Sequence, residues 1–415
     1  MLFSISLSFA GNVTFIKEYT YQASELDSKA SCRTISLEMV KRLLLEELGT
    51  YLISETEVKD FKLTKEQIKT YSAGIVGAEI IEDKWDGKTY WLRAKVSADP
   101  KEVAKSLKKI KDDQFKGKEL EETRKKAEEL TKEVERLNKE LAKATNKQPS
   151  KKIQQEYKAA IQGLTAVEWV EKGNEATINK RFKEALAAYT KAIELKYDFA
   201  AAYFGRGVAY INLGNYQQAI KDFTNTIELK PDFAAAYFGK GFSYENLGNH
   251  QQAINDYTKA IELKPDFAVA YFFRGDAYRK IGDFEQAIKD YINAIELESD
   301  FAEAYVSRGV AYVTMGNYQQ AIKDLSKSIE LKPDLAWAYF SRGNAYGRSG
   351  NYQQAINDFA KAIELEPDDA KAYYNRGVNY HNLGNFQQAI EDFKIAARLG
   401  LEPAQDFLHK IGEKW

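Results

Sequence analysis

Cysteine is almost absent from this sequence, since Cys32 is the single thiol in 415 residues. One thiol excludes a disulfide within the chain and a metal cluster built from several cysteines. Histidine is nearly as rare, and His250, His381 and His409 are too far apart to match a short metal-ligand motif. We therefore expect a protein without a metal centre or another cofactor.

Long apolar runs and an excess of one charge are also missing. A helix that crosses a bilayer needs roughly 18 to 20 apolar residues, and no stretch of the sequence approaches this. The 60 basic residues are balanced by 61 acidic ones. Because no overall field attracts phosphate groups, we predict neither a membrane span nor nucleic acid as a partner.

The first ten residues, MLFSISLSFA, fit two interpretations. Their apolar character and the small residues Ser8 and Ala10 match the end of a truncated secretory signal peptide, although the usual basic start is missing. Leu, Ile and Phe also alternate with Ser, as in a strand. We expect export to the periplasm, with a cytoplasmic protein that starts at Met1 as the alternative.

Residues 11–100 alternate between strand and helix patterns. In order, the patterns predict a strand at 13–21, a helix at 24–53, a short helix at 63–72, and strands at 74–85 and 88–98. Asp86-Gly87 separates the last two runs and predicts a hairpin, because such turns favour residues that accept positive φ. This order of elements predicts a small α+β domain. It resembles the N-terminal domain of flagellar assembly protein T and related exported envelope proteins.

Residues 101–165 are rich in Lys and Glu and predict a charged helical spacer. Apolar residues spaced three and four apart form one narrow seam, which consists of Leu120, Ala127, Leu130, Val134, Leu137, Leu141 and Ala144. A seam of about three heptads is short for a coiled coil. Residues 120–144 therefore predict either a solvated spacer or an element of self-association, and 146–150 (NKQPS) predicts a break.

The remainder of the chain repeats itself every 34 residues without a slip. The repeat is marked by small residues in two columns and by large aromatic residues in a third. The first column is Gly173, Gly207, Gly241, Gly275, Gly309, Gly343 and Gly377; the second is Ala185, Ala219, Ala253, Ala287, Ala321, Ala355 and Ala389; the third is Trp169, Tyr203, Tyr237, Tyr271, Tyr305, Tyr339 and Tyr373. Such a period indicates stacked supersecondary units.

Residues 166–399 resemble seven tetratricopeptide repeats. The resemblance implies a mainly α fold, in which helical hairpins stack into a right-handed α-solenoid and residues 400–415 close it with a capping helix. The residue types at fixed positions of the repeat are those that a helical hairpin requires. Gly248 allows the first helix of a repeat to end in left-handed geometry, Gly241 and Ala253 permit close helix approach, and Pro265 ends the second helix.

One departure from the common pattern is a basic residue where Leu is usual. These residues are Lys172, Arg206, Lys240, Arg274, Arg308, Arg342 and Arg376, and Asp222, Asp256, Asp290, Asp324, Asp358 and Asp392 follow the last six at a distance of 16 residues. We predict a ladder of ion pairs between the two helices of each repeat. The alternative is that both charges remain solvated.

The same resemblance implies that the first helix of each repeat lines a concave groove that binds a polypeptide. Family positions that face the ligand give the candidate partner-binding residues Phe204, Phe238, Phe242, Phe272, Asp276, Arg279, Trp337, Phe340, Asn344, Arg348, Tyr374 and His381. An apolar stripe with polar interruptions suits a peptide with apolar anchors. The alternative is that the aromatic stripe is packing.

We predict a scaffold or adaptor for protein binding without enzymatic activity. The repeats contain no Gly-rich phosphate loop and no recognisable nucleophile, base and acid set. The opposing hypothesis is an enzyme whose active site lies within residues 11–100, although the charged residues there form no recognisable constellation.

Overall fold

The computed structural model describes residues 6–7, 13–24, 26–54, 64–112, 114–143 and 151–415. The chain divides into two compact units, an N-terminal unit of residues Met1–Gly239 and a C-terminal unit of residues Lys240–Trp415. Each unit is described by itself below. The leader predicted for residues 1–10 lies outside the described residues, apart from Ser6 and Leu7.

The N-terminal unit begins with an antiparallel sheet in the order β1-β2-β4-β3. The strands are β1 (Ser6–Leu7), β2 (Val13–Gln22), β3 (Glu79–Trp85) and β4 (Thr89–Ala98). β2 and β4 pair along their whole length, from Val13 opposite Ala98 to Gln22 opposite Thr89. Alternate residues of both strands are buried, as the period of two in a sheet with one covered face requires.

The predicted hairpin between β3 and β4 is present, and Gly87 alone of its two turn residues has a positive φ, of 92°. The Asp86 carboxylate accepts hydrogen bonds from the backbone N–H groups of Lys88 (2.8 Å) and Thr89 (2.6 Å). These bonds lower the pKa of the Asp86 carboxyl. Asp86 therefore stabilises the predicted turn through its side chain, which accepts these two backbone hydrogen bonds.

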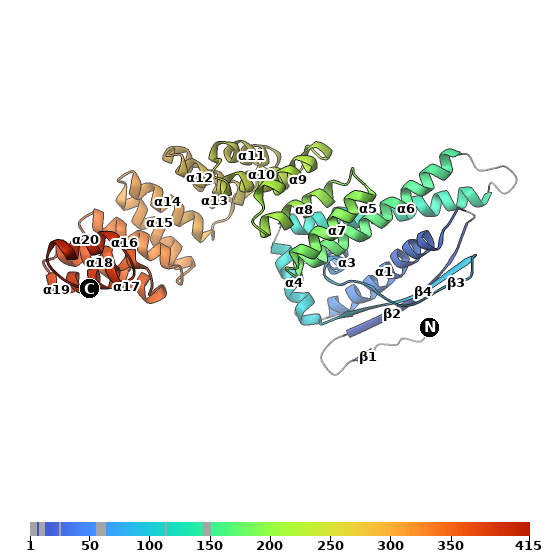
Figure 1. The fold of residues 1–415 in the computed structure, drawn as a ribbon, viewed down its shortest axis with the longest axis horizontal. Helices are drawn as coiled ribbons and strands as arrows, with labels where there is room; N and C mark the ends of the chain where they lie inside the picture. The colour runs from blue at the N-terminus through green and yellow to red at the C-terminus, as the bar shows by residue number, and fades with distance from the viewer. Residues whose placement is uncertain (1–5, 8–12, 25, 55–63, 113, 144–150) are drawn as a thin grey trace. The chain divides into compact units, whose positions relative to one another are not determined.

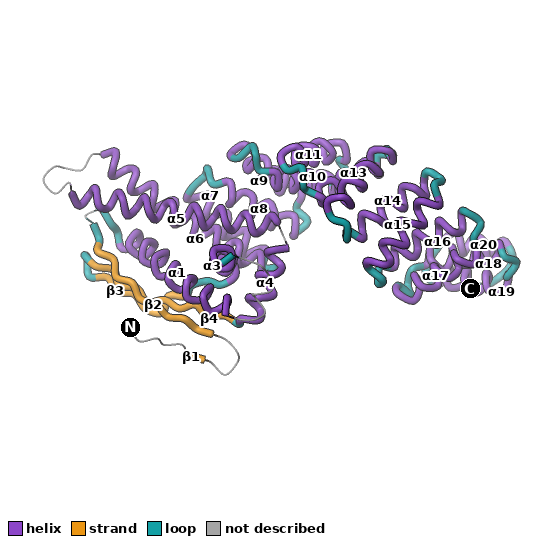
Figure 2. Tube along the Cα trace, turned by 180° about the vertical axis from the view of Figure 1, so that it is seen from behind, coloured by secondary structure: helices purple, strands orange, loops and turns teal. Residues whose placement is uncertain are grey.

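Helices cover the inner face of the sheet in two layers (Figures 1 and 2). α1 (Lys29–Ser54) packs directly on β2 and β4, and its Leu44, Leu48 and Leu52 are fully buried. α3 (Lys65–Ile75) packs at its side, and α4 (Pro100–Asp112) packs on α3 and α5. The long antiparallel helices α5 (Gln114–Lys143) and α6 (Lys151–Ile178) lie on the side of α1 that faces away from the sheet.

The segment expected as a spacer is part of the N-terminal core. Leu120, Val134 and Leu137 of α5 are buried in one cluster with the sheet, α1, and Tyr157 of α6. Ala127, another seam residue, is buried in the neighbouring cluster that contains the first repeat. The described seam residues, from Leu120 to Leu141, therefore pack within the chain itself, which differs from a solvated spacer. Ala144 lies outside the described residues, and self-association stays a prediction. The predicted break at 146–150 lies outside the described residues.

The single thiol lies in this core. Cys32 on α1 is fully buried, and burial raises its pKa to about 12. We expect no reaction with Ellman's reagent at pH 8 in the folded protein, because the thiolate is the nucleophile and is both scarce and covered. Full reaction is expected in denaturant. Rapid modification of the folded protein would show that α1 opens readily.

Seven helical hairpins follow, with two elements in each. The first helices are α6, α8 (Ala200–Asn212), α10 (Ala234–Asn246), α12 (Ala268–Lys280), α14 (Ala302–Thr314), α16 (Ala336–Arg348) and α18 (Ala370–Asn382). The second helices are α7 (Phe182–Leu195), α9 (Tyr216–Leu229), α11 (His250–Leu263), α13 (Phe284–Leu297), α15 (Tyr318–Leu331), α17 (Tyr352–Leu365) and α19 (Phe386–Arg398). α20 (Glu402–Lys410) packs on α19, as expected of a closing helix.

Glycine ends the first helix in six of the seven hairpins. Gly248, for example, has a φ of 78°, and the backbone N–H of Asn249 then donates to the carbonyl of Tyr244 at 2.9 Å. Lys180 holds the same place in the first repeat with a φ of 57°. A side chain in this conformation is strained by contact between its Cβ and the next carbonyl.

Lys180→Gly should therefore stabilise the N-terminal unit. The relieved strain, roughly 1 to 2 kcal/mol, exceeds the entropy that glycine loses on folding, so we expect a gain of about 1 kcal/mol in the free energy of unfolding. Urea titration of the variant checks this. Gly214→Ala, at the equivalent place in the next repeat, is the matched control and should lose stability.

The small residues of the repeat permit the close helix contacts that the sequence predicted. A Cβ on Gly241 would lie 2.9 Å from the ring of Tyr257 and 3.2 Å from the carbonyl oxygen of Ala253. Tyr257 and Ala253 are both fully buried. The first helix can therefore approach the second only because Gly241 has no side chain.

The predicted ion-pair ladder is present. Five of the six pairs are bidentate arginine–aspartate contacts with distances between 2.6 and 2.8 Å, and the sixth is Lys240 with Asp256 at 3.2 Å. Asp290 is 3% exposed, so its pair with Arg274 is not a solvated contact. Arg274 also donates to Thr258 of the preceding repeat at 3.0 Å. Lys172 contacts Glu168 instead.

Candidate functional site

The first helices of the C-terminal unit form a continuous surface. α12 contacts α14, α14 contacts α16 and α16 contacts α18, while the second helices pack against them from behind (Figure 1). We call the surface of α12, α14, α16 and α18 the first-helix wall. Nine of the twelve candidate partner-binding residues belong to these four helices, namely Phe272, Asp276, Arg279, Trp337, Phe340, Asn344, Arg348, Tyr374 and His381.

A hollow of about 410 Å³ lies on this wall between α14, α16 and α18. It contains two of the predicted residues, Asn344 and Arg348. Its complete lining is Val313, Asn344, Gly347, Arg348, Asn375, Val378, Asn379 and Asn382. Among the described residues, no carboxylate lines it.

Hydrogen bonds hold the amides of the hollow in place. Asn375 Nδ2 donates to Asn344 Oδ1 at 3.2 Å, and Asn379 Nδ2 donates to the backbone carbonyl of Asn375 at 2.7 Å. Arg348 is exposed and forms no ion pair with a described residue. The hollow therefore offers carboxamides and one positive charge, which suit hydrogen-bond acceptors of a polypeptide.

Sequence reasoning missed Gly347, Val378, Asn379 and Asn382. Asn379 occupies a column that holds Ala in four of the other repeats, at Ala209, Ala277, Ala311 and Ala345. A Cβ on Gly347 would lie 2.8 Å from Asn379 Oδ1. The small Gly347 and the large Asn379 are thus paired departures from the repeat pattern, and this pairing is the signal that could have located the hollow.

The aromatic stripe divides into accessible and buried residues. Trp337 is 53% exposed and stacks on Phe340 with a centroid separation of 5.5 Å and an interplanar angle of 13°. Phe340 itself is 8% exposed and packs on Phe359. Trp337 can therefore meet a partner, whereas Phe340 is a core residue.

Other predicted aromatic residues also serve packing. Phe204 is 5% exposed and contacts Phe233 of the N-terminal unit at 4.8 Å, which corrects its assignment to the groove. Phe272 is half-buried against Tyr291 and Phe301. Phe238, Phe242 and Tyr374 are likewise half-buried, the last two against Phe273 and Phe393. Their rings fill the spaces between neighbouring helices.

The predicted polar residues differ in their partners. Asp276 accepts hydrogen bonds from the Tyr291 hydroxyl at 2.7 Å and from Arg279 at 3.2 Å. Burial, together with Asp276, raises the pKa of Tyr291. Asp276 and Arg279 thus satisfy a buried hydroxyl, while His381 is exposed and lies edge-on to Phe386 at 5.1 Å.

Comparison with known proteins agrees with this architecture. A family model described as TPR repeat matches residues 173–214, 275–316 and 311–350, and models described as tetratricopeptide repeat match residues 200–233, 234–267 and 340–400. The chain belongs to the tetratricopeptide repeat family. No curated protein matches the sequence.

Several solved structures are similar to parts of this chain. The crystal structure of the MamA protein is 30% identical, with 41% of this chain and 94% of that chain covered and a TM-score of 0.38. YrrB, a TPR protein with an unusual peptide-binding site, is 24% identical, with 45% and 96% covered and a TM-score of 0.40. A tetratricopeptide repeat protein from Parabacteroides merdae is 20% identical, with 59% and 98% covered and a TM-score of 0.48.

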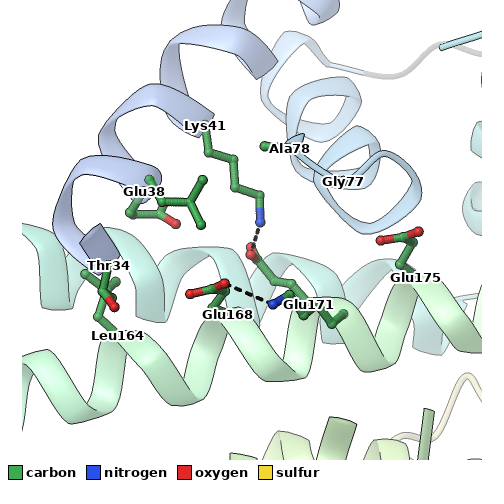
Figure 3. A pocket seen from close by; sticks show the side chains of 11 residues that line it. Thr34, Glu38, Lys41, Gly77, Ala78, Leu164, Glu168, Glu171 and Glu175 are labelled. Atoms are coloured by element: carbon green, nitrogen blue, oxygen red, sulfur yellow. Dashed lines mark hydrogen bonds and ion pairs between the residues drawn. The ribbon is translucent and has the colours of Figure 1, made fainter. Parts of the chain in front are cut away.

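The N-terminal unit has a polar pocket of about 100 Å³ between α1, residues Gly77 and Ala78 after α3, and the first tetratricopeptide helix, α6 (Figure 3). Every charged residue of its lining takes part in an ion pair. The pairs are Glu38 with Arg124, Lys41 with Glu171, Glu168 with Lys172, and Glu175 with Arg181. The first two pairs join α1 to α5 and to α6, whereas Glu168 and Lys172 lie on one turn of α6.

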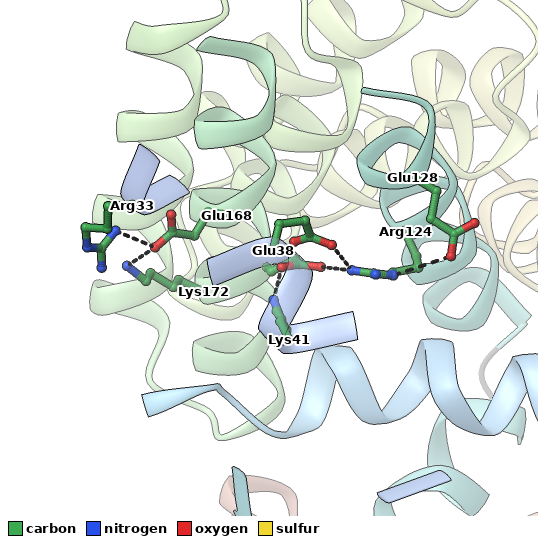
Figure 4. Close-up of polar contacts among 8 residues, drawn as sticks. Arg33, Glu38, Lys41, Arg124, Glu128, Glu168 and Lys172 are labelled. Carbon is green, nitrogen blue, oxygen red and sulfur yellow. Dashed lines mark hydrogen bonds and ion pairs between the residues drawn. The ribbon is translucent and has the colours of Figure 1, made fainter. Parts of the chain in front are cut away.

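Three residues of the pocket lining, Glu38, Lys41 and Glu171, form a buried charge network with Arg124 (Figure 4). Arg124 of α5 donates to Glu38 of α1 at 2.5 Å and lies 3.9 Å from Glu171 of α6, which also pairs with Lys41. Burial raises the pKa of the Glu38 carboxyl, although Arg124 opposes the shift. The network links three helices, and no local pattern in the sequence predicts it.

Proposed function

We propose that this protein is a scaffold whose first-helix wall binds a partner polypeptide. The observation that supports this most strongly is the hollow beside Asn344 and Arg348, where carboxamides are presented together with a guanidinium that forms no ion pair with a described residue. The exposed Trp337 on the same helix adds an apolar contact. Interfaces are commonly anchored by aromatic and arginine residues of this kind.

Site-specific photo-crosslinking tests the proposal. A photoreactive phenylalanine in place of Trp337 should yield discrete crosslinked polypeptides in cells. The same group in place of Gln354, which is exposed on the second helix α17 of that repeat, should yield none of these species. Identical products from both positions, or none from Trp337, would contradict the assignment of the wall.

We further propose that the protein acts in the periplasm. The apolar start of the sequence and the small residues Ser8 and Ala10 support export, and a cytoplasmic adaptor is the alternative. Among the described residues, no helix is long and apolar enough to cross a bilayer. Cell fractionation with N-terminal sequencing tests the location, since a mature chain that begins near Gly11 would establish processing.

A catalytic role for residues 11–100 is the competing function. The charged residues that line the N-terminal pocket are joined in ion pairs, which favours a structural role for them. Turnover of any member of a substrate panel by the full chain, lost on replacement of Glu38 or Lys41 with retained folding, would favour the enzyme.

A further inference from the structure

Trp337 differs from its counterparts on the wall. The equivalent residues of the neighbouring first helices are Glu303 and Lys371, both of which are charged; Lys371 is exposed and Glu303 is half-buried. One face of the Trp337 ring is covered by Phe340, and about half of the side chain remains exposed. A stacked indole with a free surface is a platform for another flat apolar ring, such as that of proline or an aromatic residue.

The hollow lies further along the same helix. Seven residues separate Trp337 from Asn344 and eleven separate it from Arg348, which correspond to about 10 and 16 Å along an α-helix. An extended polypeptide covers about 3.3 Å per residue, so these distances correspond to about three to five residues of a ligand.

The charge of the hollow decides which side chain fits there. Arg348 contributes the single formal charge of its lining and forms no ion pair with a described residue. Asn344, Asn375 and Asn382 supply carboxamide groups beside it. A carboxylate gains a charge-assisted hydrogen bond there, whereas an ammonium or guanidinium group would be repelled.

We infer that the partner contacts the wall through an extended segment in which a proline or aromatic residue covers Trp337 and an Asp or Glu about three to five positions away enters the hollow beside Arg348. This inference depends on the proposed function and specifies the chemistry of the partner. It assigns the two contacts to opposite ends of α16.

Selection from a library of random dodecapeptides displayed on phage, against the full chain, tests this motif. Enriched peptides should carry a proline or aromatic residue and an acidic residue at the stated separation. A synthetic peptide from the selection should bind the full chain in fluorescence anisotropy. Trp337→Ala and Arg348→Glu should each weaken its binding at least about tenfold, as expected for anchor residues.

Two variants control for unspecific effects. Tyr197→Ala removes a ring that is 80% exposed in the N-terminal unit, and Arg398→Glu reverses an exposed charge on the second helix α19; neither should change the affinity. Lack of enrichment, enriched peptides without the paired residues, or a basic residue in place of the acid would overturn the inference. If crosslinking at Trp337 still succeeds, the proposed function stands while this motif fails.

Discussion

Arg124→Met is expected to lower the free energy of unfolding of the N-terminal unit by about 3 to 5 kcal/mol, because it leaves two buried carboxylates without their shared guanidinium. Glu38 and Glu171 are 8% and 6% exposed, so water cannot replace the lost partner. Methionine preserves most of the volume of the arginine stem. Urea unfolding monitored by circular dichroism measures the change.

The matched control for Arg124 lies on the same helix. Arg136 also pairs with two carboxylates, those of Glu133 and Glu140, each at 2.5 Å, but its side chain is 49% exposed. Arg136→Met should cost far less, since exposed ion pairs are solvated and screened. Similar losses for the two variants would show that the buried network contributes no more than a surface pair.

Arg274→Met is expected to lower the free energy of unfolding of the C-terminal unit by about 2 to 4 kcal/mol at pH 8, because it leaves the buried Asp290 carboxylate without its ion-pair partner. The same side chain joins Asp290 of α13 to Thr258 of α11, so its loss loosens two successive repeats. Lys327→Met, which removes an exposed pair with Glu330, should cost under about 1 kcal/mol.

The loss caused by Arg274→Met should depend on pH. Burial raises the pKa of Asp290 in the native protein, and Arg274 opposes that rise. Without the guanidinium the folded pKa rises further above the unfolded one, so the folded state binds a proton more readily. The variant therefore recovers stability as pH falls through the raised folded pKa and loses it again as pH rises. A loss independent of pH would contradict the buried pair.

The repeats were predictable because the packing of two helices requires small and large residues at fixed positions. Gly241, Ala253 and Tyr257 recur in every repeat with the same spacing or a close substitute, and each is forced by the close approach of two helices. The ladder followed from a constant separation of 16 residues. Only the structure could show that its carboxylates are buried.

The role of α5 was not predictable, since a narrow apolar seam reads the same whether it meets a second chain or the chain's own core. Arg124 and Glu38 are 86 residues apart, and no local pattern brings them together. The first-helix wall could likewise be predicted only in part. Spacing places Trp337 and Phe340 on one surface, but burial by the adjacent helix separates their roles.

The central claim is tested most directly with a partner identified by crosslinking at Trp337. Calorimetric titration compares the wild type with two triple variants, one on the wall (Asn344→Ala, Arg348→Ala, Asn382→Ala) and one on exposed second-helix glutamines (Gln320→Ala, Gln354→Ala, Gln388→Ala). The wall variant should raise Kd at least about tenfold with an unchanged thermal midpoint, and the glutamine variant should leave Kd unchanged. Equal affinity of the wall variant and the wild type would contradict the account.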